Sequence, residues 1–227
     1  MHYSGEENLE VMNHAKNYNN WLCQHIVQAM PPNAKNIIDF GAGDGCFAKS
    51  LTKQNNKHIT CIEPAQNMLS CLQDFVVYDN LDKIKDNSQD FIYSLNVLEH
   101  IENDVEVIRK IYQKLKPNGL TFIYVPAFQF LYSTMDKKVG HYRRYSRKEL
   151  INKFQQAGFS ISECRYADFA GFWATLLFKF LPAQSGTPSV SSIKFYDKFV
   201  FPLSMFIDKI TKGRVFGKNL CLIATKK

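Results

Sequence analysis

Short apolar runs alternate with amphipathic stretches along most of the chain. The amphipathic stretches, clearest at 102–115, carry apolar residues at helical spacing and predict helices. The apolar runs predict buried strands near 36–41, 58–63, 75–78, 90–95 and 119–125. A chain in which strands and helices alternate in this way is expected to form a parallel sheet with helices on both faces. Such a sheet binds its ligands at the carboxyl ends of the strands.

Two further helices are expected on either side of this alternation. Residues 8–30 have the pattern of one amphipathic helix that stops at the proline pair beginning with Pro31. A capping box at 146–149 opens a second helix, which Gly158 ends. The expected inward face of the first helix consists of Val11, Ala15, Tyr18, Leu22 and Ile26.

A long insertion separates the last two expected strands, at 159–165 and 219–225. It has roughly 50 residues, where short connections are the rule. Its apolar run at 169–181 has about 13 residues, well short of the roughly 20 needed to span a bilayer. A second, aromatic helix is expected at 195–210, broken or kinked near Pro202. An insertion of this length is a functional candidate.

A glycine-rich turn links the first expected strand to the helix that follows it. The turn begins after Asp39 and contains Gly41, Ala42, Gly43 and Gly45. Three glycines without Cβ atoms let the backbone approach a nucleotide-like ligand closely. The turn therefore predicts a site for such a ligand.

The acid at the end of the second expected strand helps to choose the ligand. Glu63 lies about 18 residues past the last glycine, where nucleotide-binding α/β folds place a carboxylate that takes two ribose hydroxyls. Both NAD and S-adenosylmethionine carry that ribose. NAD sites have G-x-G-x-x-G, whereas the glycines here are spaced G-x-G-x-G. The spacing favours S-adenosylmethionine, and a glycine-rich turn with a solvated Glu63 is the plain structural alternative.

Four successive segments carry a resemblance to a known family. They are 39–45, Glu63-Pro64, 90–100 and 115–120. In order and spacing they resemble the motifs of class I S-adenosylmethionine-dependent methyltransferases, over about residues 35–165. The resemblance implies an α/β, Rossmann-like seven-stranded sheet, parallel except for one antiparallel C-terminal strand, with helices on both faces and a helical lid before the last strand. The chain departs from the commonest pattern at Asn118, where a glycine is usual.

The same resemblance implies where S-adenosylmethionine binds. Its methionine part is expected against the glycine turn, its ribose on the acid after the second strand, and its adenine between 67–68 and 79–81. Its sulfonium is expected beside the end of the fourth strand. The expected cofactor residues are Asp39, Gly41, Ala42, Gly43, Gly45, Glu63, Pro64, Asn67, Met68, Asp79, Leu81 and Asn96.

A polar block at 132–145 follows the fifth strand and belongs to the same rim. It contains a G-H-x-R-R-Y pattern that resembles one subgroup of these methyltransferases. His141 is a candidate general base, because its unperturbed pKa lies near neutrality. Arg143 and Arg144 are expected either to clamp a carboxylate or phosphate of the acceptor, or to brace the loop by pairing with Asp136.

His100 is a second and weaker candidate base, because the Glu99-His100 pair opens a helix and capping and packing are the favoured explanation for it. No third metal ligand accompanies this pair in sequence, so no metal site is expected. Methyl transfer from a sulfonium mainly requires that nucleophile, methyl carbon and sulfur be aligned, and it leaves S-adenosylhomocysteine. A hydroxyl or acidic carbon acceptor needs a base, whereas a carboxylate needs only desolvation and positioning.

Two interpretations of the insertion remain open, beside a dimer contact. It is either a lid that covers the cofactor and lines a substrate pocket, or a lid that also presents an apolar and basic surface to a membrane or a lipid-linked substrate. The aromatic residues concerned are Phe172, Trp173, Phe178, Phe180, Phe195, Phe199 and Phe201. The basic residues are Lys179, Lys194, Lys198, Lys209, Lys212, Arg214 and Lys218.

Composition agrees with one methyltransferase domain, because 227 residues with 45% hydrophobic content suffice for one core. Its expected parts are a helical cap (1–34), a cofactor-binding core (35–167), the lid (168–218) and a closing strand (219–227). Six scattered cysteines and an N-terminus without signal-peptide features predict reduced thiols. The expected location is cytoplasmic, or peripheral at the inner membrane face.

The net charge of +7 keeps nucleic acid open as an alternative partner. Two absences weigh against base methylation. Residues 96–99 lack the Asn/Asp-Pro-Pro-aromatic motif of amino methyltransferases, and no Pro-Cys nucleophile is present. We predict S-adenosylmethionine-dependent methyl transfer to a small-molecule or lipid-linked acceptor, with a non-catalytic cofactor-binding subunit as the other alternative. The methylated atom and the oligomeric state are left open.

Overall fold

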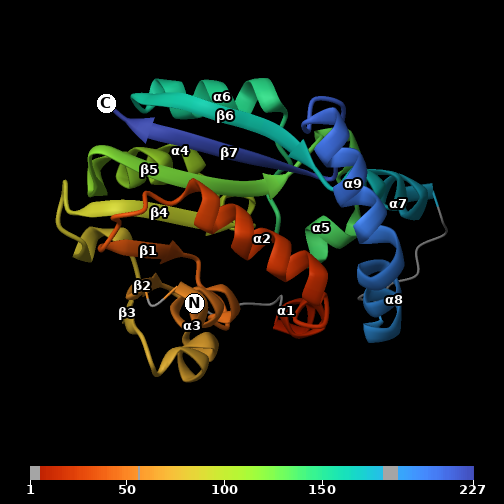
Figure 1. The fold of residues 1–227 in the computed structure, drawn as a ribbon, viewed down its shortest axis with the longest axis horizontal. Coiled ribbons are helices and arrows are strands. Elements are labelled where there is room, and N and C mark those ends of the chain that lie inside the picture. The colour runs from red at the N-terminus through yellow and green to blue at the C-terminus, as the bar shows by residue number, and fades with distance from the viewer. Residues whose placement is uncertain (1–5, 56, 181–188) are drawn as a thin grey trace.

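The computed structural model describes residues 6–55, 57–180 and 189–227 (Figure 1). It consists of one seven-stranded sheet with helices packed around it. The elements in chain order are α1 (Glu6–Met12), α2 (Lys16–Ala29), β1 (Ile37–Phe40), α3 (Cys46–Asn55), β2 (Ile59–Ile62), η1 (Gln66–Leu72), β3 (Val76–Tyr78), η2 (Leu81–Lys83), β4 (Gln89–Leu95), η3 (Leu98–His100), α4 (Asp104–Lys114), β5 (Leu115–Pro126), η4 (Gln129–Leu131), α5 (Thr134–Lys138), α6 (Arg147–Gln156), β6 (Phe159–Ala167), α7 (Phe169–Phe180), α8 (Val190–Phe195), η5 (Tyr196–Val200), α9 (Phe201–Thr211) and β7 (Asn219–Lys226).

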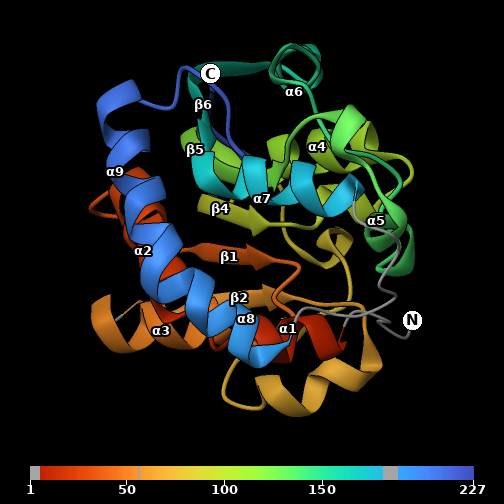
Figure 2. The same cartoon turned by 90° about the vertical axis from the view of Figure 1, so that its right-hand side faces the viewer.

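The strand order of the sheet is β3-β2-β1-β4-β5-β7-β6. The pairs from β3 to β5 are parallel, and β7 runs antiparallel to both of its neighbours. The predicted Rossmann-like sheet with one antiparallel C-terminal strand is thus confirmed. In Figure 1, β1, β4 and β5 point toward the edge where α1, α5, α7 and α8 lie, and Figure 2 views that edge directly.

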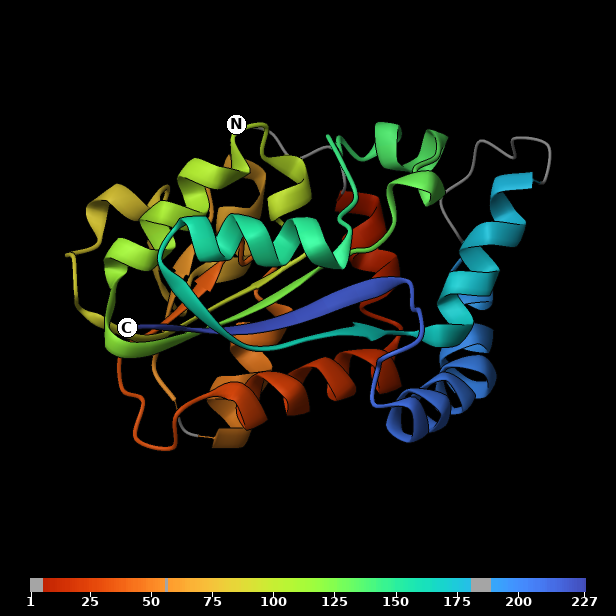
Figure 3. The same cartoon turned by 90° about the horizontal axis from the view of Figure 1, so that it is seen from above.

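Two apolar clusters hold the sheet between its helical layers. Ile38 and Phe40 of β1 pack in a cluster with Ile108 of α4, whereas Ile37 belongs to a second cluster with Leu22 of α2. Successive side chains of a strand point to opposite faces, so a continuous apolar run is buried on both. Figure 3 shows α6 and α2 on opposite sides of the strands. Burial of each such side chain stabilises the fold by roughly 1.5–3 kcal/mol.

The helix predicted at 8–30 is wrong as one element, because the chain breaks between α1 and α2. The side-chain amide of Asn13 donates to the Asp44 carboxylate of the glycine turn (2.6 Å) instead of continuing a helical face. Ala15 gives α2 no side-chain cap. The carboxylate of Asp197, in η5, takes this role by accepting from the backbone N–H groups of Asn17 and Tyr18, both at 2.9 Å. A contact distant in sequence therefore starts α2.

Two other local differences have conformational reasons. Asn118 has a φ of +64°, which is the left-handed conformation that glycine adopts readily and that asparagine tolerates. The helix predicted at 195–210 is instead α8, the π-helical turn η5 and α9. Pro202 lies in the first turn of α9, where its missing N–H has no helical partner to lose.

The lid occupies the connection between β6 and β7. It leaves the sheet at Ala167 and returns at Asn219, and these two residues are paired in the β6–β7 register. The Asp208 carboxylate of α9 accepts from the backbone N–H of Asp168 (2.7 Å), just before α7. This contact ties the second half of the lid to the start of the first half.

Candidate active site

Strand register brings the predicted cofactor residues to one edge of the sheet. Phe40 is level with Ile62 across β1 and β2, and Ile62 is level with Tyr78 across β2 and β3. The next residues, Gly41 and Glu63, donate backbone hydrogen bonds to the carbonyls of Ile62 and Tyr78, each 2.8 Å long. The glycine turn and the acid that were predicted from sequence therefore lie side by side.

The Glu63 carboxylate is fixed against the glycine turn. One oxygen accepts from the backbone N–H of Gly43 (2.7 Å), and the other accepts from the backbone N–H of Ala65 (2.9 Å). The side chain is buried. Each carboxylate oxygen has two lone pairs, so both keep capacity for a ribose hydroxyl. This arrangement fits the role predicted for Glu63.

The three glycines of the turn cannot carry side chains. Gly41, Gly43 and Gly45 have φ values of +80°, +55° and +75°, which L side chains rarely adopt. A Cβ on Gly41 would lie 2.3 Å from a methyl carbon of Val97, and one on Gly45 would lie 2.6 Å from a methyl carbon of Leu72. The turn is therefore a bare-backbone cradle, as the nucleotide-type ligand requires.

Carboxylates near the glycine turn make the electrostatic potential around it negative. Burial, together with the nearby carboxylates of Glu63 and Asp44, raises the pKa of Asp39 to about 7. S-adenosylmethionine carries a positive sulfonium, which such a field attracts. The charge of the site thus fits this cofactor as well as its shape does.

The other predicted cofactor residues lie along the same edge with different exposures. Met68 in η1 and Leu81 in η2 are buried, and Asn67 is half-buried. Pro64 and Asn96 are exposed, and Asn96 follows β4 with a φ of +53°. The predicted set is completed by Ala42, which is buried in the glycine turn, and by Asp79, which follows β3 and pairs with Lys83 at 3.1 Å.

Helix α1 covers the glycine turn, which the sequence pattern did not indicate. The Cδ1 atom of Leu9 lies 3.2 Å from where a Gly43 Cβ would be. The hydroxyls of Tyr18 and Tyr124 are hydrogen-bonded at 3.2 Å where α2 crosses β5. Of the residues expected to face inward, Ala15, Leu22 and Ile26 are buried, whereas Val11 and Tyr18 are half-buried. Helical periodicity could not indicate which distant segments these side chains contact.

The polar block at 132–145 forms a braced loop. Asp136 is buried and accepts two hydrogen bonds from the Arg144 guanidinium, at 2.8 and 3.0 Å. His141 Nδ1 lies 2.8 Å from the same carboxylate. Burial alone would raise the pKa of Asp136, but hydrogen bonds from His141 and Arg144 outweigh burial and hold that pKa well below its usual range. Of the two predicted roles for Arg144, the structure shows the bracing contact.

Arg143 is engaged in a second ion pair. Its guanidinium lies 3.0 Å from the carboxylate of Asp104 and donates to the Glu102 carbonyl at 2.6 Å. Asp104 is buried and also accepts from the Tyr145 hydroxyl (2.7 Å) and the Lys153 ammonium (2.6 Å). The partner is not the Asp136 considered from sequence. The Arg143 guanidinium braces the start of α4. To bind a carboxylate or phosphate of the acceptor, it would have to leave Asp104.

The remaining candidates form a compact group with Glu99. The imidazole rings of His100 and His141 lie edge to face, with centroids 4.5 Å apart. Burial, and then the neighbouring His141, lowers the pKa of His100 to about 4. Glu99 is fully buried, and burial raises its pKa to about 8. The sequence showed only the Glu99-His100 pair, whereas the fold brings His141 to it from beyond α5.

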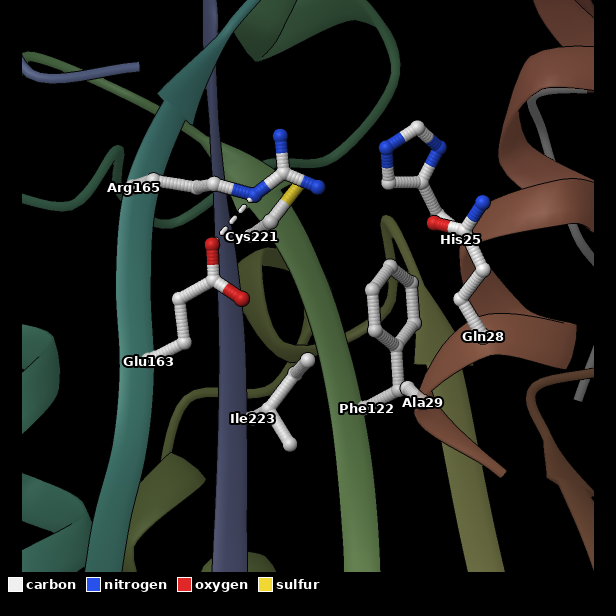
Figure 4. A pocket seen from close by; sticks show the side chains of 8 residues that line it. All are labelled: His25, Gln28, Ala29, Phe122, Glu163, Arg165, Cys221 and Ile223. Carbon is white, nitrogen blue, oxygen red and sulfur yellow. Dashed lines mark ion pairs between the residues drawn. The ribbon is translucent and has the colours of Figure 1, made fainter. Parts of the chain in front are cut away.

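A cavity of about 120 Å³ lies elsewhere, between α2 and strands β5 to β7 (Figure 4). In Figure 4, His25 and Gln28 of α2 face Glu163 and Arg165 of β6, which form an ion pair of 2.7 Å. The residues that line this cavity include neither Glu63 nor any residue of the glycine turn, so it is not part of that site.

The lid turns only some of its aromatic side chains outward. Trp173, Phe178, Phe195 and Phe199 are exposed as predicted, but Phe172 and Phe201 are buried. Phe172 packs on the rings of Phe128 and Phe216, and Phe201 packs on Tyr18 and Trp21. The side chain of Phe180 lies outside the described residues. Further exposed apolar residues of the lid are Leu177, Leu203, Phe206 and Ile210. Within the part of the chain that the structure describes, no helix is long and apolar enough to cross a bilayer.

Comparison with known proteins identifies the family and agrees with this fold. A family model described as a methyltransferase domain matches residues 12–163. The chain belongs to this methyltransferase family, and its fold is that of class I S-adenosylmethionine-dependent methyltransferases. The cofactor of this class is S-adenosylmethionine.

Individual relatives are distant. A ubiquinone biosynthesis O-methyltransferase from Rickettsia canadensis is 28% identical over 97 residues, 38% of this chain and 41% of the relative. Phosphoethanolamine N-methyltransferase 2 from Caenorhabditis elegans is 26% identical over 103 residues, 38% of this chain and 23% of the relative. The matches thus span less than half of these curated relatives.

Solved structures share the fold over nearly the whole chain. A Thermotoga maritima methyltransferase described as a possible histamine N-methyltransferase superposes with a TM-score of 0.65 at 15% identity, covering 99% of this chain and 98% of that one. An Archaeoglobus fulgidus S-adenosylmethionine-dependent methyltransferase gives 0.63 at 17% identity, covering 92% and 94%.

Proposed function

We propose that the protein transfers the methyl group of S-adenosylmethionine to an amphipathic, lipid-linked acceptor that reaches the site from a membrane surface. The observation that carries this proposal is the outward face of the lid. Phe178, Leu177 and Ile210 are 73%, 66% and 66% exposed. Exposed apolar residues in such number on one part of a domain are typical of an interaction surface.

Basic residues lie among these apolar side chains. Lys179 is exposed near the C-terminal end of α7, and Lys194 is exposed near the C-terminal end of α8. Lys198 on η5 and Lys209 on α9 are exposed as well. Apolar side chains that enter the headgroup region and lysines that face anionic headgroups are the two contributions to interfacial binding. A protein partner would bury the apolar residues but would have no general need for the lysines around them.

The position of the lid connects this surface to the chemistry. Its helices α7 and α8 lie at the edge toward which β1 and β4 point (Figure 2). Asp197, in the lid, starts α2, and α1 covers the glycine turn through Leu9. An acceptor drawn from a membrane would therefore meet the lid beside the methyl donor. The small-molecule relatives support the acceptor class in part, since one is named for phosphoethanolamine and another for ubiquinone biosynthesis.

The chemistry asked of the protein is alignment. The sulfonium supplies an already activated methyl group when the cofactor is bound. The glycine turn and Glu63 would hold the methionine and ribose parts, and the lid would exclude water and position the acceptor. For a hydroxyl acceptor, His141 is the predicted base, with Asp136 on Nδ1 leaving Nε2 to take the proton.

Methylation of extracted lipids and vesicle binding test the two halves of the proposal. Radiolabelled S-adenosylmethionine should label a component of a lipid extract, and the protein should co-sediment with anionic vesicles at low salt and be released near molar salt. The double variant Leu177→Ser and Phe178→Ser should lose vesicle binding. Val76→Ser, which changes an exposed apolar residue on β3, is the matched control. Labelling of RNA or of water-soluble extract alone, or a supernatant protein at low salt, would refute the membrane acceptor.

A further inference from the structure

The group formed by Glu99, His100 and His141 has the geometry of a metal site. One ligand atom from each residue, a carboxylate oxygen and two imidazole nitrogens, lies within 4.8 Å of the others. Glu99 and His100 are adjacent in η3, and His141 follows α5. The backbone N–H of Tyr142 donates to the Glu99 carbonyl at 2.7 Å, and this bond fixes the two segments to each other.

The buried carboxylate of Glu99 lacks the partners that a buried carboxylate needs. The side chain is fully buried, and neither of its oxygens has a hydrogen-bond partner among the described residues. The nearest basic atom of His141, Nε2, is 4.0 Å from a Glu99 oxygen, which is too far for a hydrogen bond. An ionised carboxylate without hydrogen-bond partners is strongly unfavourable when it is buried, and a cation bound to the oxygen that lies near the two imidazoles would stabilise that ionised form.

The two imidazoles are already oriented for coordination. His141 donates from Nδ1 to Asp136, so its Nε2 lone pair faces Glu99. A carboxylate that holds the second nitrogen of a ligating histidine is the common support of metal sites. The His100 ring is hydrogen-bonded to the backbone of Val139 and Gly140. The support for both rings therefore comes from residues outside the ligand set.

We propose that Glu99, His100 and His141 bind one divalent transition-metal ion of the zinc type. Two imidazoles and one carboxylate suit Zn²⁺ and its first-row neighbours, whereas Mg²⁺ and Ca²⁺ prefer oxygen ligands. Three protein ligands leave a coordination position for water or an acceptor oxygen. Because the ion would use the Nε2 lone pair of His141, this proposal replaces the role of general base for that residue. It does not depend on the proposed acceptor.

Titration of metal-free protein with Zn²⁺, followed by calorimetry, tests the site directly. We expect one ion per chain and binding at least 100-fold weaker in Glu99→Gln and in His141→Gln. Asp136→Asn keeps all three ligands and should weaken binding about 10–100-fold, because it removes only the support of His141. His25→Gln, a histidine of α2 outside the group, is the control and should bind as the unchanged protein does. Mg²⁺ at the same concentration should not compete.

Two further measurements guard against binding elsewhere and against misfolding. Co²⁺ gives absorption bands that distinguish imidazole and carboxylate ligands from thiolates, so they exclude Cys71 and the other free cysteines. Zn²⁺ should also raise the melting temperature of the unchanged protein but not that of Glu99→Gln, which should fold because it buries no charge. Thiolate bands, or equal Zn²⁺ affinity in Glu99→Gln and the unchanged protein, would overturn the proposal. So would the absence of Zn²⁺ binding, which would leave the carboxylate protonated or bound to water.

Discussion

The Glu63 carboxylate at the end of β2 accepts a hydrogen bond from the backbone N–H of Gly43 at 2.7 Å. This bond joins the acid expected on the ribose to the turn expected on the methionine part. The two halves of the cofactor site are thus positioned relative to each other before any ligand binds. Such preorganisation lowers the entropy that binding must lose.

Substitution of Glu63 tests the cofactor assignment. Glu63→Ala should weaken S-adenosylmethionine binding by about 2 to 3 kcal/mol, because charge-assisted hydrogen bonds to the ribose are lost. Isothermal calorimetry gives the affinity. Glu149→Ala, in the first turn of α6, removes a carboxylate that pairs with Lys153 and should bind the cofactor normally. Unchanged affinity in Glu63→Ala would remove this residue from the site.

Gly41 and Val97 form a steric pair that a double-mutant cycle can measure. Gly41→Ala places a Cβ 2.3 Å from Val97 and also forces alanine to a φ of +80°. Stability should fall by roughly 2 kcal/mol or more. Val97→Ala should restore part of the loss by removing the clash, but not the part due to φ. Urea unfolding of the four proteins gives the coupling, and strictly additive effects would show that the turn moves away from Val97.

Asp136 should make the fold sensitive to acid. Its folded-state pKa lies below that of the unfolded chain, so its contribution to stability is complete above about pH 4 and is lost as the pH falls further. Asp136→Asn should therefore be less stable than the unchanged protein at about pH 6, and the difference should shrink toward about pH 2. Unfolding in urea at several pH values checks this. A difference that stays constant with pH would mean that Asp136 acts through packing alone.

The role of His141 can be separated from its structural contact. Glutamine can still donate to Asp136, so His141→Gln should leave melting temperature and cofactor affinity nearly unchanged. Turnover should fall by about 100-fold or more if the residue is a base. If His141 is a base, a chelator should not change the turnover of the unchanged enzyme. If His141 instead holds a metal ion, the chelator should lower that turnover about as much as His141→Gln does. A large drop in melting temperature would indicate bracing.

The sequence was most informative where neighbouring residues form one element. The strand at 36–41 and the turn beginning after Asp39 are continuous in the chain, so their pattern predicted both the β1 end and the cradle. Glu63 was found because parallel strands end at one edge. These are relations that spacing encodes.

The remainder depends on contacts between distant segments. His141 is 41 residues past His100, and their rings meet because the segment after α5 lies against η3, where the backbone N–H of Tyr142 donates to the Glu99 carbonyl. Whether Phe172 or Trp173 points inward depends on which face of α7 meets Phe128 and Phe216. Periodicity shows that a helix has an apolar face but not what that face will contact, because this is decided by the tertiary structure.

The pairing of Ala167 with Asn219 has a consequence for how acceptor choice can change. The backbone N–H of Lys218 donates to the Asp168 carbonyl at 2.9 Å, so the two ends of the lid are neighbours. Topologically, β6 and β7 are a hairpin, and the whole lid is its loop. Doubling the length of a loop costs only about 0.6 kcal/mol in closure entropy. The strand pairings around the methyl donor therefore do not depend on the length of the lid, and a lid of another length would have to keep only the contacts of Asp197 and Phe201 with α2.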